Sequence, residues 1–375
     1  MSVSNALVIG GGISGLSAAA ALAQRDVHVT LLEAKDKLGD LGGVGLSLMG
    51  NATKALALIG VAARCVEAGM PADHFTVRSV NGEIIATREW PSLGKPLWPN
   101  QIGISRASFH HILVEAATSS GVVLRCGITA RSMRQDRNRV EVVDTDGGTG
   151  SFDLVVVADG LYSSTRSQFL PNAPVPKATG LAIWRAGVRR PRNIVTTQLH
   201  FDGPHGVVGI CPISSDDSYV YCVHRDDASA RRDPSTLHEQ LREKLAGYGG
   251  FIPPLAAQLI DPALVSYRPL EWLLVPAPWF RGRVVLIGDA VHANPPNLAQ
   301  GAAMGIEDAI VLAEEVTKSE ATEISLARFM SRRWERVRLV VDVSRRIALD
   351  QVAHTRGFDA AAEMRRASTA LAVPF

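Results

Sequence analysis

Three glycines with a fixed spacing near the N-terminus are the first residues whose arrangement could do chemistry. Gly10, Gly12 and Gly15 form G-x-G-x-x-G directly after the apolar run 6–9, a pattern typical of a buried parallel strand. An alanine-rich helix, a second strand and then Glu33 follow in order. In such a unit the glycines allow a tight turn, close approach of a pyrophosphate and close helix packing, while the acid accepts hydrogen bonds from ribose hydroxyls. The spacing predicts a dinucleotide site; the alternative is a glycine turn that serves packing alone.

Two positions in the middle of the chain are also suited to binding a charged ligand. Ser105 is expected to cap a helix, and Arg106 lies in the first turn of that helix, where the helix dipole disfavours a cation. A phosphate bound beside this helix start would explain the arginine; a simply exposed arginine is the alternative. Asp159 and Gly160 follow the apolar run 154–157, so they are expected at the ligand-binding carboxyl edge of a parallel sheet, although Asp-Gly is also a good turn.

A similar strand-turn-helix unit lies in the last third of the chain. Gly288 and Asp289 follow the segment 283–287, which is expected to be another buried strand. A buried Asp289 would be costly unless a ligand hydroxyl or another donor satisfied its carboxylate. The amides of Gly301 and Ala302 begin the next expected helix, so they can stabilise negative charge placed against them.

Antiparallel strands are expected between these units. Segment 74–99 contains a predicted hairpin around Asn81-Gly82, and 176–274 alternates as strands with one helix. We therefore expect an α/β fold in which a Rossmann-like dinucleotide domain is interleaved with an antiparallel-sheet substrate domain. The expected bounds are 1–73, 100–175 and 275–349 for the first domain, 74–99 and 176–274 for the second, and 350–375 for a C-terminal tail.

Bulk properties restrict the classes of function. The 375 residues carry a formal net charge of +2, so no large field indicates a nucleic acid or an anionic membrane as partner. The four cysteines form no C-x-x-C pair, which argues against a metal site or a disulfide framework. We expect reduced thiols and a cytoplasmic protein without a signal peptide or membrane span. On the basic helix expected over 324–349, the arginines predicted to face solvent are Arg332, Arg333, Arg336 and Arg338.

As an ordered set, these motifs resemble the flavin-dependent aromatic hydroxylases of the para-hydroxybenzoate hydroxylase type. The resemblance covers nearly the whole chain and implies FAD, bound tightly but not covalently. Because there is no second G-x-G-x-x-G unit, NAD(P)H would bind only transiently; this absence also argues against disulfide-reductase-like enzymes. The matching motifs are the first glycine turn with Glu33, Ser105-Arg106-Ala107, Asp159-Gly160 with Arg166, and Gly288-Asp289 with His292, Pro296, Gln300 and Gly301.

The resemblance also implies how FAD would lie. Adenosine would sit at Gly12 and Glu33, pyrophosphate near Arg106 and Asp289, and the isoalloxazine against 296–302. The cofactor-binding residues predicted in this way are Gly10, Gly12, Ile13, Ser14, Gly15, Glu33, Ala34, Arg106, Asp159, Gly160, Gly288, Asp289, Gly301 and Ala302.

The implied chemistry is hydroxylation of a small aromatic or N-heteroaromatic compound with NAD(P)H and O2 through a flavin C4a-hydroperoxide, by a monomer or homodimer. Tyr219 is the favoured partner of a ring hydroxyl, and with an ordinary pKa of about 10 it is a relay more readily than a free base. His205 and His224 are the alternatives. The predicted catalytic residues are Tyr219, Pro296 and Gly301, and the predicted substrate residues are Trp184, Arg185, Phe201, Tyr219, Tyr221, Pro296 and Asn297.

Within the family, the chain is most similar to the urate hydroxylase, 6-hydroxynicotinate monooxygenase and salicylate hydroxylase group. Three positions depart from the pattern: Asn297 replaces an aspartate and Val207 an arginine of urate hydroxylase, and Ala299 replaces a common glycine. Urate itself is therefore not the expected substrate. Two other hypotheses stay open, a flavoprotein oxidase or reductase of the same fold and a dinucleotide-binding protein without enzymatic activity.

Overall fold

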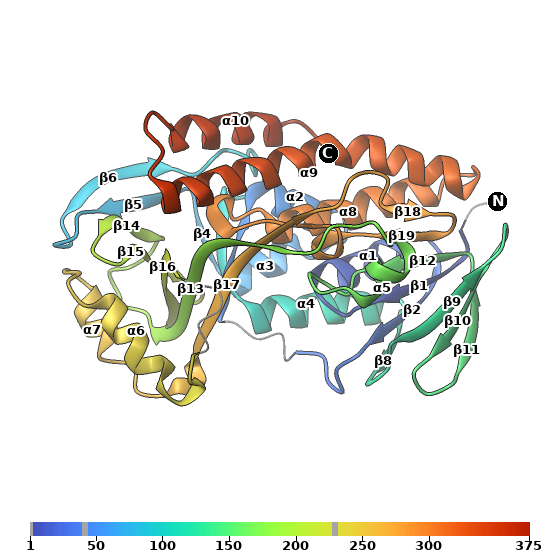
Figure 1. Ribbon diagram of the computed structural model, residues 1–375, viewed down its shortest axis with the longest axis horizontal. Coiled ribbons are helices and arrows are strands. Elements are labelled where there is room, and N and C mark those ends of the chain that lie inside the picture. The colour runs from blue at the N-terminus through green and yellow to red at the C-terminus, as the bar shows by residue number, and fades with distance from the viewer. Residues whose placement is uncertain (1–2, 40–43, 227–231) are drawn as a thin grey trace.

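A six-stranded sheet forms the centre of the part of the molecule on the right of Figure 1. The computed structural model describes residues 3–39, 44–226 and 232–375. The sheet has the order β18-β19-β12-β1-β2-β8, and neighbouring strands are parallel except β18 and β19. Its strands are β1 (Asn5–Ile9), β2 (His28–Glu33), β8 (Val123–Cys126), β12 (Leu154–Val157), β18 (Phe280–Arg281) and β19 (Val284–Leu286).

The inner strands of this sheet are apolar because protein covers both of their faces. Every residue of β12, Leu-Val-Val-Val in sequence, is buried. Helix α1 (Ile13–Ala23) connects β1 to β2 and packs against α4 (Arg106–Ser119) and α8 (Gly301–Val316). The strand-helix-strand unit expected around the first glycine turn is confirmed. The predicted cap of α4 is confirmed too, since the Ser105 hydroxyl accepts a hydrogen bond from the Ser108 amide at 2.9 Å.

An eight-stranded sheet forms the other part, on the left of Figure 1. Its order is β20-β17-β13-β16-β15-β14-β5-β6, and only β14 and β5 run parallel. The hairpin expected around Asn81-Gly82 is confirmed as β5 and β6. The strands are β5 (His74–Arg78), β6 (Ile84–Glu89), β13 (Lys177–Arg189), β14 (Gln198–Gly203), β15 (Gly206–Pro212), β16 (Asp217–Arg225), β17 (Val265–Leu274) and β20 (His292–Ala293).

Two short helices, α6 (Leu237–Leu245) and α7 (Ile252–Ala256), cover one face of this sheet. Trp184, Val220 and Cys222 are buried beneath them in a cluster of their own. Successive side chains of a strand point to opposite faces. The residues that alternate with these three along β13 and β16, such as Arg185 and Tyr219, therefore belong to the other face. That face meets the segment 44–47, for example where the Tyr219 ring contacts Gly45.

The remaining strands form two three-stranded sheets, with the orders β3-β7-β4 and β11-β10-β9. The α/β class with an interleaved antiparallel sheet is confirmed, whereas the exact domain bounds stay predictions. The elements are β3 (Gly45–Met49), β4 (Met70–Ala72), β7 (Gln101–Ser105), β9 (Ala130–Gln135), β10 (Val140–Asp144), β11 (Thr149–Phe152), α2 (Gly50–Ala57), α3 (Ala62–Ala68) and α5 (Ser164–Phe169).

The C-terminal region is more ordered than the tail expected over 350–375. The long helix α9 (Thr322–Ala353) is followed by α10 (Ala360–Ala372), which lies along it at the top of Figure 1. Arg336 of α9 donates hydrogen bonds to the carbonyls of Ala370 and Leu371 at 3.1 and 3.0 Å. A helix end leaves such carbonyls without partners, so this arginine stabilises the end of α10.

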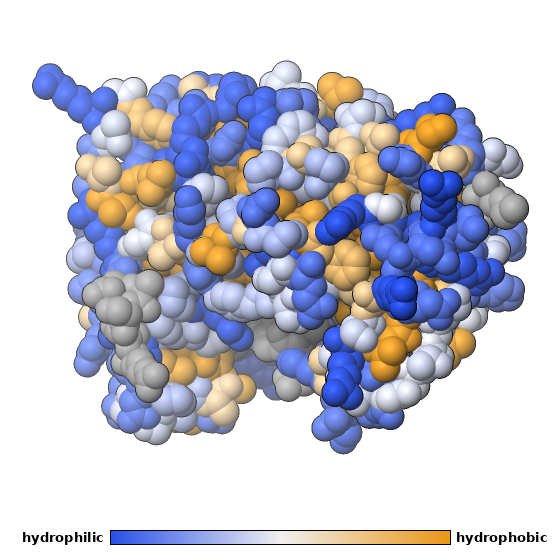
Figure 2. All heavy atoms as spheres, turned by 45° about the vertical axis from the view of Figure 1, so that its right-hand side comes forward, coloured by the Kyte–Doolittle hydropathy of each residue, from blue (hydrophilic) through white to orange (hydrophobic). Residues whose placement is uncertain are grey.

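In the parts of the chain that the structure describes, no helix combines the length and apolar character needed to cross a bilayer. Figure 2 shows hydrophilic and hydrophobic side chains intermixed over one face of the molecule. That mixture is ordinary for a folded protein in water.

Candidate active site

The three glycines of the first turn have different structural roles. Gly10 has φ +108°, and a Cβ there would lie 2.4 Å from the Ala158 carbonyl oxygen. A Cβ on Gly15 would lie 1.9 Å from the Gly10 carbonyl oxygen, whereas one on Gly12 would meet no atom within 4 Å. Packing therefore requires Gly10 and Gly15. The open side of Gly12, at the start of α1, leaves room for a ligand to approach the backbone.

Glu33 and His110 hold the peptide between Gly10 and Gly12 from two sides. Glu33 accepts hydrogen bonds from the amides of Gly11 at 2.7 Å and Lys35 at 2.9 Å, one on each carboxylate oxygen. A carboxylate has about four acceptor positions, so Glu33 can still accept from ribose hydroxyls. His110 Nε2 lies 2.8 Å from the Gly11 carbonyl oxygen, and burial lowers the pKa of this histidine. Sequence reasoning missed His110 because it lies on the buried face of α4 with no motif around it.

The first turn contacts the turn that carries Gly288 and Asp289. The Ser14 hydroxyl occupies the space where a Cβ of Gly288 or Gly305 would lie, at 2.3 and 2.1 Å from the two positions. Glycine at both places lets α1 and α8 approach closely. Two other predicted cofactor residues differ in burial. Ile13 is partly buried against the core, whereas Ala34 is exposed just after β2.

The middle turn contacts both of the others. A Cβ on Gly10 would collide with Ala158, the residue before Asp159. The buried Arg166 donates hydrogen bonds to the carbonyls of Leu161 and Ala290, both at 2.9 Å. Together with the contact of Ser14 and Gly288, every pair among the three turns is in contact. Segments separated by more than a hundred residues thus form one continuous site, as a single elongated ligand requires.

Arg106 and Asp289 bring opposite charges to this site. Burial lowers the pKa of the Arg106 guanidinium, and Arg185 lowers it further, while Asp289 raises it. The Asp289 side chain is partly exposed to solvent. The protein around it still raises the pKa of its carboxyl, although His292 and Arg106 each lower that pKa. The carboxylate is thus reached by solvent and is also close to surrounding protein.

The segment after the third turn leads into α8 through a strained residue. Ala299 has φ +53°, a left-handed conformation that costs an alanine about 1–2 kcal/mol, which explains why glycine is common there in the family. Pro296 and Asn297 lie in the short helix Pro296–Leu298, and Asn297 donates to the Gln351 side chain at 3.1 Å. Gly301 begins α8 with open space on its Cβ side, where the nearest atom is Asn294 Oδ1 at 3.7 Å.

Several buried polar atoms in these same segments have no hydrogen-bond partner. Their chemistry shows whether FAD fits the site. Buried side-chain atoms rarely lack hydrogen bonds. Within the described residues of the predicted motifs, Gly160 has φ +85° and an open Cβ side, and several buried atoms have no partner. These atoms are Arg106 Nε, Asp159 Oδ1, His292 Nδ1, Asn294 Oδ1 and Asn297 Oδ1. A cation, acceptors and a helix start along these three contacting turns fit a long ligand with phosphates and hydroxyls, so the residues fit FAD.

Arg185, Tyr219 and Tyr221 lie together on the face of the eight-stranded sheet that meets 44–47. Arg185 pairs with Tyr221 across β13 and β16, and the two tyrosine rings are 5.7 Å apart. Burial raises the pKa of Tyr219 well above its ordinary value and also raises that of Tyr221. Both phenols are therefore protonated at neutral pH. The Tyr219 ring lies 2.5 Å from where a Cβ of Gly45 would be, so glycine is required opposite it.

The prediction that Trp184 contacts substrate is wrong. Trp184 is fully buried on the opposite face, where its Nε1 donates to His224 Nε2 at 2.7 Å. The period of two along β13 separates it from Arg185. His224 is thereby also removed from the cleft. Phe201 is 43% exposed on β14, three strands from β13, so the structure does not bring it beside Tyr219.

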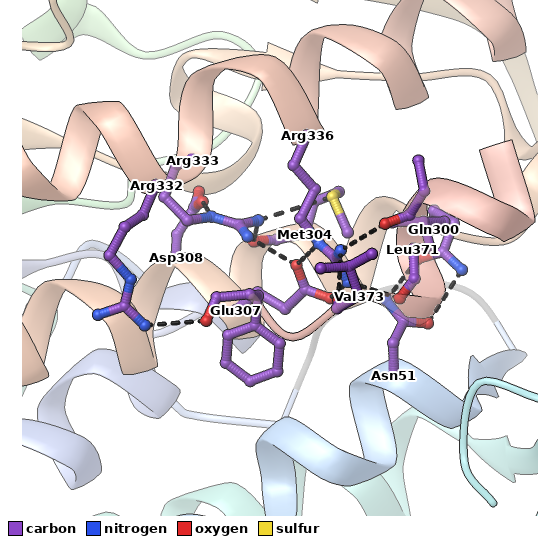
Figure 3. A network of polar contacts seen from close by, with 12 residues as sticks. Asn51, Gln300, Met304, Glu307, Asp308, Arg332, Arg333, Arg336, Leu371 and Val373 are labelled. Carbon is purple, nitrogen blue, oxygen red and sulfur yellow. Dashed lines mark hydrogen bonds and ion pairs between the residues drawn. The ribbon is translucent and has the colours of Figure 1, made fainter.

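A buried ion network behind the site corrects the expectation that the arginines of 324–349 face solvent (Figure 3). Arg333 is fully buried and donates to Asp308 at 2.8 Å and to Glu307 at 2.7 Å. Asp308 also accepts from the Gly288 amide at 3.0 Å and lies 2.5 Å from His292 Nε2. These partners hold the pKa of Asp308 at about 2 despite its burial. The network therefore connects the third turn to α9, and of the four arginines Arg338 is exposed as expected.

Comparisons with known proteins agree with this geometry. A family model described as FAD binding domain matches residues 4–344. The 2-heptyl-3-hydroxy-4(1H)-quinolone synthase of Pseudomonas aeruginosa is 31% identical over 82% of this chain and 79% of its own. The FAD-dependent urate hydroxylase of Klebsiella pneumoniae is 28% identical over 90% of this chain and 87% of its own.

A solved structure shows the same arrangement of elements. Klebsiella pneumoniae HpxO complexed with FAD and uric acid superposes with a TM-score of 0.82 at 26% identity, covering 98% of this chain and 92% of that one. The family match spans nearly all of the chain, and the three turns that converge in the structure lie within it. The chain therefore belongs to the FAD binding domain family and is an FAD-dependent monooxygenase of the aromatic hydroxylase type.

Proposed function

We propose that the protein uses NAD(P)H and O2 to hydroxylate a small aromatic or N-heteroaromatic compound that carries an anionic group. Three distant turns meet at one site, beside a sheet face with two protonated phenols and an arginine that has no partner among the described residues; this supports the proposal. Relatives named for urate and for a quinolone product support the substrate class. When bound, FAD supplies the redox chemistry and oxygen activation, and the protein supplies binding and orientation.

Arg185 is the residue that favours an anionic substrate. Among the described residues, its guanidinium has no hydrogen-bond or ion-pair partner, although burial lowers its pKa and Arg268 adds positive charge nearby. Arg185 is partly buried, and a cation that loses part of its hydration without gaining a partner is costly. A carboxylate or a phenolate of the substrate would pair with it, and guanidinium–carboxylate pairs are well suited to fix orientation.

Tyr219 is proposed to donate a hydrogen bond to a ring substituent rather than to remove a proton. Its raised pKa keeps the proton on the phenol at neutral pH. A neutral phenol held by packing against Gly45 can orient a substrate oxygen without ionising. Pro296, Asn297 and Gly301 are proposed to line the other side, at the start of α8.

Purified protein provides the test. It should contain FAD and oxidise NADH or NADPH faster when phenols, hydroxypyridines or hydroxyquinolones with an acidic group are added. The product should gain the mass of one oxygen atom, and neutral analogues should stimulate oxidation much less. Stimulated oxidation without an oxygenated product would support the oxidase or reductase alternative instead. Equal stimulation by neutral and anionic analogues would remove the role proposed for Arg185.

A further inference from the structure

The N-terminus of α8 lacks the side-chain cap that often satisfies the first amides of a helix. Gln300 occupies the N-cap position, but its side chain makes no hydrogen bond to the first amides of α8. Those amides have no partner within a helix. In this helix the first amide to bond backward is that of Met304, which donates to the Gln300 carbonyl at 2.9 Å. The positive end of a sixteen-residue helix is thus left available at the site where Gly301 has open space.

Asn51 holds the Gln300 side chain away from its own helix. Gln300 Nε2 donates to Asn51 Oδ1 at 3.1 Å, and Asn51 Nδ2 donates to Gln300 Oε1 at 2.9 Å. Both residues are 2% exposed. This reciprocal amide pair explains why Gln300 cannot cap α8.

Asn51 also holds α8 at a second point. Its Nδ2 donates to Glu307 Oε1 at 2.7 Å, about two turns into α8. Glu307 is itself fixed by Arg333 and by Arg336, each at 2.7 Å, as Figure 3 shows. One side chain of α2 is therefore bonded to α8 at its start and farther along, and the second acceptor cannot move because two guanidinium groups hold it.

We propose that Asn51 and Gln300 are positioning residues that keep the first amides of α8 uncapped and directed at the flavin. This inference rests on the proposed function, because it assumes that FAD lies against Gly301 and Ala302. The uncapped amides stabilise negative charge, and a flavin gains negative charge when it is reduced. Loss of the amide pair frees the start of α8, so reduced FAD loses more binding energy than oxidised FAD.

The experiment measures the midpoint potential of bound FAD without substrate. Asn51→Leu and Gln300→Met remove the pair with little change in volume. We expect each variant to retain FAD and to bind reduced FAD about tenfold more weakly relative to oxidised FAD, a shift of about 30 mV to more negative potential for a two-electron couple. Thr53→Val is the matched control, since Thr53 lies on the same helix, fully buried, with a hydroxyl that has no partner.

The double variant separates a joint role from two independent ones. If the residues act as a pair, the double variant should show the shift of either single variant rather than their sum. Additive shifts would overturn the pair. An unchanged potential together with a lower melting temperature would show that the amides only support packing, which would also overturn the inference.

A failure of the proposed function and a failure of the positioning role would give different results. Wild-type protein that binds no FAD would contradict the proposed function. Wild-type protein that binds FAD, with variants whose potential equals that of Thr53→Val, would contradict only the positioning role. If Asn51→Leu does not fold, Gln300→Met decides alone, because it retains the bond from Asn51 to Glu307.

Discussion

The two faces of the eight-stranded sheet have opposite chemistry although they come from the same strands. On the face under α6 and α7, two large aromatic side chains have partners within the protein: Trp184 donates to His224, and Tyr267 donates to Asp226 at 3.0 Å, whereas the buried Ser218 hydroxyl has none. On the face toward 44–47, Arg185 has no partner among the described residues. One face packs its aromatic side chains as a core, and we propose that on the other face a ligand supplies a partner for Arg185.

The difference shows how a sheet can serve stability and binding at once. Neighbouring residues such as Trp184 and Arg185 are separated by the pleat, so each face can be optimised independently. A polar group that is buried without a partner lowers stability, and the free energy of ligand binding can offset that cost. Substitutions on the two faces should therefore affect different measurements, stability on one and catalysis on the other.

The largest effect is expected from Trp184→Ala. Removing this fully buried indole leaves a cavity under α6 and breaks the hydrogen bond to His224. Such changes cost about 3–5 kcal/mol in the free energy of unfolding. Urea denaturation should show this loss, while the KM of the folded fraction for its aromatic substrate stays unchanged. A raised KM with normal stability would mean that the two faces are not separate.

Arg185→Met should have the reverse effect. The loss of a charged hydrogen bond to substrate is worth about 1.5–3 kcal/mol, so kcat/KM should fall about 10- to 100-fold. Stability should stay the same or rise, because a partly buried cation without a partner is removed. Arg189→Met on the same strand is the matched control, since Arg189 is largely exposed and pairs with Asp217. Equal kinetics for both variants would contradict the substrate role.

Tyr219→Phe should reduce kcat about tenfold, as expected for the loss of one hydrogen bond of about 1.4 kcal/mol, with FAD still bound. Tyr267→Phe, on the other face, provides the comparison: it loses a bond to Asp226 and should lower stability without changing kcat. Unchanged hydroxylation of the native substrate by Tyr219→Phe would remove Tyr219 from the mechanism.

A smaller effect is expected from pH. Burial lowers the pKa of His224 in the folded protein, so the unfolded chain, with an ordinary value near 6.5, binds more protons. Stability from the neutral histidine is therefore present above about pH 6.5 and is lost as pH falls below it. The melting-temperature difference between wild type and His224→Asn should narrow between pH 7.5 and 5.5. A constant difference would show that His224 keeps the same charge in both states.

The first turn shows what can be predicted from local pattern. The glycines at 10, 12 and 15, the helix and Glu33 lie within one strand-helix-strand unit, where each residue type has a local reason. The same holds for the hairpin at Asn81-Gly82 and for the cap at Ser105. These features depend on neighbours in sequence, so they were predictable.

The buried network shows what could not be predicted. Arg333 and Asp308 are charged residues on amphipathic helices, which sequence pattern places at the surface. Their burial depends on partners about 25 residues apart and on α10, which covers α9. His110 and Asn51 are similar cases, because only the packed structure brings them to Gly11 and Gln300.

By itself, the sequence determined the FAD-binding family, the α/β class and the order of the three turns, because each rests on short-range spacing. Only the tertiary structure decided that the turns meet, that Arg185 and Tyr219 share a face without Trp184, and that Asn51 bonds to Gln300 at the start of α8. The physical reason is that alternation along a strand defines two faces but does not say which one the rest of the chain will cover.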